Sequence, residues 1–146
     1  MSVSLLDVNM LIALAWPSHI HHVQAHTWFD ENASFGWATC PITQCAFVRI
    51  SSNPKIIPEA VSPREVLELL GQIISQKHHI FWPDDIPLLE KYIPDKLLIG
   101  HRQITDAYLL GLAIKNKGKL VTFDKGISSL IHSKSTHMAT LEILEL

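Results

Sequence analysis

The most informative stretch of the sequence is residues 104–124, ITDAYLLGLAIKNKGKLVTFD. Residues 104–115 are apolar on nearly every side until their final lysine, which predicts a helix that is central or at an interface. A turn and a predicted strand over residues 119–123 follow. From Asp106 the helix carries the chain about 15 Å away, at about 1.5 Å per residue. The strand returns it about 16 Å, at about 3.3 Å per residue, so Asp106 and Asp124 are expected near one edge of a sheet.

Strands and helices alternate along the rest of the chain. One segment carries a full set of helix-start signals, because Ser62 precedes Pro63 and is followed by Glu65 three residues later, a capping box. The predicted strands are residues 3–8, 36–40, 79–82 and 138–143, and the predicted helices are 10–16, 19–32, 42–52, 62–75 and 86–92, with a helical turn over 126–131. This alternation predicts an α/β domain with a mostly parallel sheet, and residues 1–146 are expected to form one domain.

Composition excludes several classes of protein. The chain has 146 residues, a formal charge of −2 and two cysteines, which suit a reduced cytosolic domain and not a disulfide scaffold. The longest apolar run, residues 107–114, is too short for a membrane span, and no secretion signal is expected at the N-terminus. The charge argues against a generally basic nucleic-acid binder. Residues 91–134 nevertheless hold eight basic and three acidic side chains, whereas residues 1–90 hold four and nine.

Three carboxylates are candidates for a common site. Asp7 ends the first predicted strand and, if that strand is parallel to the one before Asp124, it joins Asp106 and Asp124 at the same edge. Each also has a structural interpretation. Asp7 is then a helix cap, Asp106 complements the positive end of its helix dipole, and Asp124 is a turn residue. Carboxylates crowded together repel one another, and a divalent cation bound by oxygen ligands, Mg²⁺ or Mn²⁺, would offset their charge. Gln44 shares a helix face with apolar residues and either points toward these acids or bonds to backbone.

Several segments together resemble one family. They are LLDVN (5–9), TCPITQ (39–44), FVR (47–49), SNP (52–54), GHRQITDAYLL (100–110) and TFDKG (122–126). These segments resemble the PIN-domain ribonucleases, and most closely the VapC-type toxins of prokaryotic toxin–antitoxin pairs. The similarity extends from about residue 3 to residue 130.

The resemblance implies a three-layer fold with a central, mostly parallel sheet between helices, and a Mg²⁺- or Mn²⁺-dependent endoribonuclease acting on transfer, ribosomal or messenger RNA. It further implies a cognate antitoxin, a homodimer and a cytoplasmic location, with no membrane partner. The residues carried over are Asp7, Asp106 and Asp124 as metal ligands and Gln44 where a Glu is usual. For the mechanism, we expect Asn9 and Thr105 to orient the ligands. His101 and Arg102, just upstream of Asp106, are expected to hold the RNA phosphate.

Other interpretations lead to different tests. Gln44 suggests a catalytically weakened relative that binds RNA with or without metal. A receiver-type domain also collects carboxylates at strand ends, but it usually has adjacent acids after its first strand, where this chain has Asp7 alone. His19, His21, His22 and His26 resemble a metal-binding tract, although exposed helix histidines are commoner than zinc sites. The four tryptophans are expected in the core or against a partner.

Overall fold

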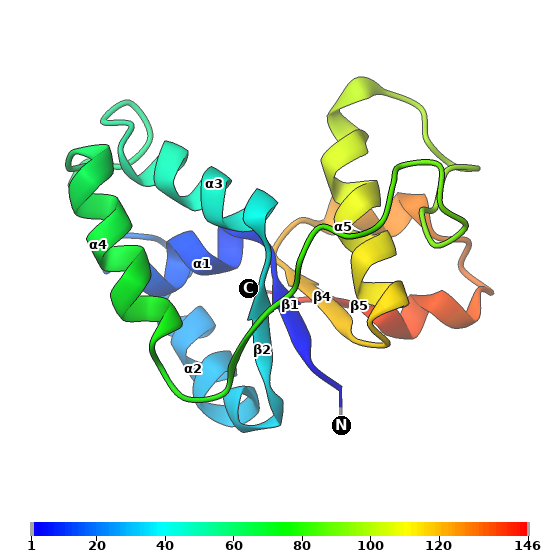
Figure 1. Ribbon diagram of the computed structural model, residues 1–146, viewed down its shortest axis with the longest axis horizontal. Coiled ribbons are helices and arrows are strands. Elements are labelled where there is room, and N and C mark those ends of the chain that lie inside the picture. The colour runs from blue at the N-terminus through cyan, green and yellow to red at the C-terminus, as the bar shows by residue number, and fades with distance from the viewer. Residues whose placement is uncertain (1, 146) are drawn as a thin grey trace.

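Five parallel strands form the central sheet, in the order β3-β2-β1-β4-β5 (Figure 1). The computed structural model describes residues 2–145. The strands are β1 (Ser4–Leu6), β2 (Trp37–Thr39), β3 (His79–Phe81), β4 (Lys119–Thr122) and β5 (Leu141–Ile143). The helices are α1 (Val8–Ala15), α2 (His22–Asn32), α3 (Pro41–Ser51), α4 (Pro63–Ile74) and α5 (Ile104–Lys115), with short 3-10 segments η1 (Ala33–Phe35), η2 (His101–Gln103), η3 (Lys125–Leu130) and η4 (Thr136–Thr140).

Helices cover both faces of the sheet and create two separate cores. Neighbouring residues of a strand point to opposite faces, so Leu5 packs in the core under α5 while Leu6 packs in the core under α1 and α2. Leu120 and Val121 of β4 divide in the same way. In Figure 1, α1 to α4 lie on one side of the strands and α5 on the other. The predicted three-layer α/β architecture is therefore confirmed.

One predicted helix has its predicted extent, and another has its predicted N-cap. The α5 helix spans Ile104–Lys115, as predicted. In α4, the Ser62 side chain accepts a hydrogen bond from the Glu65 backbone N–H (3.2 Å) and its hydroxyl donates to Glu65 Oε1 (2.9 Å). The first bond satisfies one backbone N–H that a helix N-terminus leaves without a partner. The predicted capping box is formed in part, because the Glu65 carboxylate accepts from the Ser62 hydroxyl and not from the Ser62 backbone N–H.

The structure corrects the prediction for residues 86–92, which form turns and not a helix. Two isolated turns are closed by hydrogen bonds from Glu90 N to Pro87 O (3.1 Å) and from Ile93 N to Glu90 O (3.0 Å). Ile86 and Ile93 are buried in the core, whereas Leu89 is fully exposed. The segment is held by widely spaced apolar anchors and not by one continuous helical face.

Other differences concern the ends of elements. The first helix begins at Val8 and so contains Asn9, and α2 begins at His22, three residues later than predicted. The last strand covers only Leu141–Ile143, because η4 occupies the preceding residues. Its three residues pair with Leu120–Thr122 of β4, the last three residues of that four-residue strand. None of the helices within residues 2–145 has the length and apolar character needed to cross a bilayer.

Candidate active site

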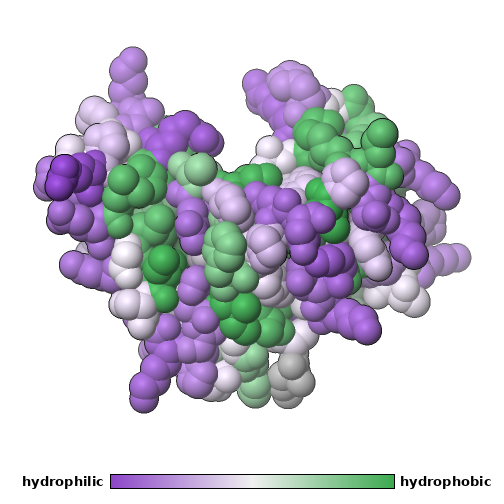
Figure 2. Space-filling view, in the orientation of Figure 1, coloured by the Kyte–Doolittle hydropathy of each residue, from purple (hydrophilic) through white to green (hydrophobic). Residues whose placement is uncertain are grey.

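All five strands run the same way, so their carboxyl ends lie along one edge of the sheet. This edge lies toward the top of Figure 1, and in the same orientation Figure 2 shows the surface hollowed there, between the side formed by α3 and α4 and the side formed by α5. In such sheets, ligands bind beyond the carboxyl ends of the strands.

Asp7 follows β1 directly and is buried, with 5% of its surface exposed. It caps α1, because Oδ1 accepts a hydrogen bond from the Val8 backbone N–H (2.7 Å). Oδ2 accepts a hydrogen bond from the Thr122 hydroxyl (2.9 Å). Burial raises the pKa of this carboxyl, the bonds from Thr122 and Val8 lower it, and the charge of Asp124 raises it. Asp7 is thus a helix cap and a member of an acidic group at once.

Thr122 joins the residues around Asp7 into one network. Its hydroxyl donates to Asp7 and accepts hydrogen bonds from Asn9 Nδ2 (2.9 Å) and from the Asp124 backbone N–H (3.0 Å). Asn9 Oδ1 accepts a further bond from the Phe123 backbone N–H (3.2 Å). Asn9 therefore fixes the backbone that leads to Asp124. The sequence gives no signal for this role of Thr122. Leu6 pairs with Val121, and because Asp7 and Thr122 are the next residues of their chains, the two side chains face each other.

Asp106 lies in the first turn of α5 and is half-buried. Burial, followed by the charges of Asp7 and Asp124, raises its pKa to about 6. The third acid, Asp124, caps η3 by accepting a hydrogen bond at Oδ1 from the Gly126 backbone N–H (2.8 Å). The three carboxylates thus share one electrostatic environment, as the length calculation predicts.

No basic side chain within residues 2–145 forms an ion pair with these three acids. The two salt bridges of the described chain join Lys115 to Asp85 and Lys119 to Glu142. Uncompensated carboxylate oxygens are the donors that a hard divalent cation prefers, so the chemistry and charge of the group fit Mg²⁺ or Mn²⁺. In the described part of the chain, no three His, Cys, Asp or Glu side chains lie close enough together to form a complete coordination site for a metal ion.

Gln44 occupies the first turn of α3 and is half-buried. Its Nε2 donates to the hydroxyl of Thr39 (3.0 Å), the last residue of β2, and that hydroxyl lies 2.8 Å from His79 Nε2. Of the two alternatives open from the sequence, neither describes this bond, since the partner is a side-chain hydroxyl. Gln44 is therefore anchored to the neighbouring strand β2 through Nε2, and its carbonyl oxygen Oε1 takes no part in that bond.

The remaining predicted residues flank the N-terminus of α5. His101 and Arg102 are exposed on η2, where they are accessible to a ligand at this edge. Thr105 is exposed in the first turn of α5 and faces a hollow lined by Ile42 and Arg49 of α3, so its orienting role stays a prediction. Thr122 is the threonine that bonds to Asp7 and to the backbone of Asp124. The loop before α5 is held by Gln103, whose Oε1 accepts hydrogen bonds from the backbone N–H groups of Ile99 and Gly100.

The histidine tract has a structural role. His22 Nδ1 lies 2.7 Å from the Ala13 carbonyl oxygen, and His26 Nε2 lies 2.8 Å from that of Leu14. Both rings thereby satisfy carbonyl groups at the C-terminal end of α1 that have no partner within the helix. Trp28, Trp37 and Trp82 are buried, as expected for core residues.

Comparisons with known proteins agree with this geometry. Residues 4–131 match the PIN domain family. The chain is 45% identical to Ribonuclease VapC38 of Mycobacterium tuberculosis over 97% of this chain and 100% of that protein, and 44% identical to Ribonuclease VapC39 of the same species over 86% and 91%. The crystal structure of VapBC2 from Rickettsia felis bound to a DNA fragment from their promoter has a similar fold, with a TM-score of 0.58 at 14% identity, over 98% of this chain and 99% of that chain. The protein therefore belongs to the PIN-domain family and, within it, to the VapC ribonucleases.

Proposed function

We propose that this protein is an endoribonuclease, the toxin of a VapBC-type toxin–antitoxin pair, and that it cleaves phosphodiester bonds in cellular RNA. One observation carries the proposal: Asp7, Asp106 and Asp124 converge at the carboxyl edge of the sheet without a basic partner among the described residues. The identity of 45% to a VapC ribonuclease over nearly the whole chain supports the same conclusion.

We further propose Mg²⁺ or Mn²⁺ as the cofactor, held by Asp7, Asp106 and Asp124. When bound, such a cation would lower the pKa of a water molecule and offset the negative charge that develops on the phosphate under attack. The chain's own residues prepare the site. Thr122 holds the Asp7 carboxylate, and together with Asn9 it anchors the backbone that carries Asp124. These hydrogen bonds fix the Asp7 carboxylate and the backbone at Asp124 with respect to each other.

Arg102 and His101 are proposed to bind the RNA backbone next to the cleaved bond. Both are exposed on η2, immediately before the helix that carries Asp106. Contacts from arginine and histidine to phosphate oxygens position a nucleic acid without reading its sequence. Their role would therefore be to place the strand across the acidic group.

Gln44 favours a second candidate function, a weakened or regulatory RNA-binding protein. A neutral amide in place of a carboxylate removes one negative charge, and here that amide is bonded to Thr39. Such a protein would bind RNA equally well with and without Mn²⁺. Metal titration of RNA binding and cleavage separates the two functions.

We also propose that the protein acts in the cytoplasm, forms a homodimer and binds a cognate antitoxin. Cys40 and Cys45 are both free thiols, as expected in a reducing compartment. Exposed apolar side chains such as Leu67, Ile99 and Ile104 offer surface for such contacts. Light scattering on the isolated chain and copurification with the protein encoded beside it test both associations.

The decisive experiment measures Mn²⁺-dependent cleavage of total cellular RNA by the purified protein and by its Asp7→Asn and Asp106→Asn variants. Asparagine is a good helix N-cap, so Asp7→Asn retains the start of α1 while removing the charge. We expect cleavage by the wild type and loss of cleavage in both variants. An exposed carboxylate on α2, replaced in Asp30→Asn, provides the matched control. Full activity in either site variant would contradict the assignment, and sequencing of the new RNA ends would identify the RNA that is cut.

A further inference from the structure

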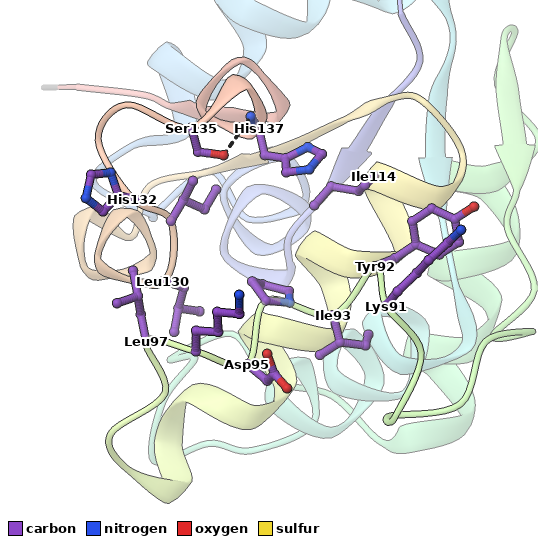
Figure 3. A pocket seen from close by; sticks show the side chains of 13 residues that line it. Lys91, Tyr92, Ile93, Asp95, Leu97, Ile114, Leu130, His132, Ser135 and His137 are labelled. Carbon is purple, nitrogen blue, oxygen red and sulfur yellow. Dashed lines mark hydrogen bonds between the residues drawn. The ribbon is translucent and has the colours of Figure 1, made fainter.

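A cavity of about 320 Å³ lies beside the C-terminal half of α5, apart from the acidic edge of the sheet (Figure 3). Its apolar lining includes Ile93, Ile114, Leu130 and Ile131. These residues come from three segments, the irregular stretch after β3, the last turn of α5, and the end of η3 with the residue that follows it. The volume is at the lower end of the range for ligand sites and suits one group of roughly nucleotide size.

The lining of this cavity also carries charged side chains. Lys91 and Lys96 line it, with Asp95 as the single carboxylate. Neither lysine takes part in the salt bridges found within residues 2–145. The Lys91 ammonium instead lies 5.5 Å from the centre of the Tyr92 ring. Two lysines against one carboxylate leave a net positive charge, which favours an anionic ligand.

Flat side chains accompany the cations. Tyr92, His132 and His137 all line the cavity, and Figure 3 shows the His137 ring beside Ile114. The backbone of His137 is held by a hydrogen bond from its N–H to Ser135 Oγ (3.1 Å). Tyrosine and histidine rings are surfaces on which unpaired RNA bases stack, and lysines bind the phosphates between them. The combination of rings and cations fits a nucleotide better than it fits an acidic peptide.

The cavity is also at a suitable distance from the candidate active site. Eight residues of α5 separate Asp106 from Ile114, or about 12 Å at about 1.5 Å per residue. The η3 segment starts next to Asp124 and ends at Leu130, again about 12 Å at about 2.0 Å per residue. A distance of about 12 Å corresponds to three or four stacked nucleotides at about 3.4 Å each.

We propose that this cavity binds a nucleotide of the substrate RNA three to four positions from the cleaved bond. Lys91 and Lys96 bind its phosphates, and the base lies against the rings of Tyr92, His132 and His137. The inference rests on the proposed ribonuclease function. It gives a role to the basic segment over residues 91–134, which the acidic centre alone does not explain.

The test measures the binding of a fluorescein-labelled oligouridylate of 12 nucleotides by anisotropy, in EDTA to prevent metal-dependent cleavage. The variant Lys91→Gln/Lys96→Gln is compared with the wild type between about 50 and 200 mM KCl, because binding through phosphate contacts weakens steeply over this range of salt. The matched control is Lys55→Gln/Lys77→Gln, which removes two exposed lysines outside the cavity. Circular dichroism and Mn²⁺ titration check that each variant is folded with an intact acidic site.

We expect the dissociation constant of Lys91→Gln/Lys96→Gln to rise about tenfold, and the slope of log K against log salt to fall by about 1.4, or about 0.7 for each lost phosphate contact. His132→Ala/His137→Ala should weaken binding with the slope nearly unchanged. In the wild type, an oligouridylate carrying 4-thiouridine should cross-link to residues 91–97 or 130–137.

Equal binding by the cavity variants and the wild type, an equal loss in the control pair, or cross-links confined to other segments would overturn the proposal. Binding in EDTA is independent of catalysis. If the cavity binds RNA but the protein does not cleave RNA, the proposed ribonuclease function is contradicted, whereas RNA binding by the cavity is still supported.

Discussion

Replacing Asp106 by Asn should stabilise the metal-free protein while removing its catalytic function. Burial and the charges of Asp7 and Asp124 raise the pKa of Asp106 from 3.8 to about 6, so its ionised form is disfavoured in the folded state. This difference corresponds to at most about 3 kcal/mol. Asp106 is only half-buried, and solvent screening reduces the expected gain to about 1–2 kcal/mol. For a chain of this length, that gain raises Tm by about 3–6 °C.

The pH dependence of the stability gain shows whether ionisation of Asp106 is its cause. A raised carboxyl pKa means that the folded protein holds a proton which the unfolded chain releases, so stability falls as the pH rises from 3.8 to about 6. Above pH 6 the ionised wild type carries the full cost, and below 3.8 it carries none. The advantage of Asp106→Asn should therefore be complete at pH 7.5 and small near pH 4.

Differential scanning calorimetry in EDTA across this pH range measures the effect, with Asp30→Asn as an exposed control. Addition of Mn²⁺ at about 100 times its dissociation constant should stabilise the wild type by about 2.7 kcal/mol and the Asp106→Asn variant by much less. Two results would contradict this reasoning: a variant less stable than the wild type at pH 7.5, or a variant whose stability advantage at pH 4 equals that at pH 7.5. Either would show that the ionised Asp106 carboxylate is not destabilised by burial and by the charges of Asp7 and Asp124.

Three further predictions concern residues around the site and the fold. Thr122→Val should cost about 1–3 kcal/mol in urea unfolding and reduce RNA cleavage, because it leaves buried partners unpaired, whereas Thr122→Ser should retain most of both. Gln44→Glu should tighten Mn²⁺ binding measured by calorimetry, since it adds a negative charge at this edge of the sheet, and an unchanged affinity would remove Gln44 from the site. Ser62→Ala should lower the free energy of unfolding by about 1 kcal/mol through loss of the α4 cap, with RNA cleavage unaffected.

Sequence reasoning was most accurate where the signals are local. The α5 helix and the Ser62 N-cap of α4 were predicted correctly, because a helix depends on residues three and four positions apart. Residues 86–92 misled the same reasoning. Their apolar residues suggest a helix, but Ile86 and Ile93 are held by a core assembled from distant segments.

In the candidate active site too, the sequence predicts what depends on local structure and not what depends on contacts between distant segments. Helix and strand lengths were enough to bring Asp106 and Asp124 to one edge. Asp7 was expected there on the condition that β1 is parallel to β4, which the structure confirms. It was not enough to reveal that Thr122 orients Asp7, a contact between residues 115 positions apart. Nor did it show the bond of Gln44 to Thr39 or the cavity beside α5, which three separate segments line. The direction in which a side chain points depends on its packed neighbours, and those neighbours are known only after the layers have come together.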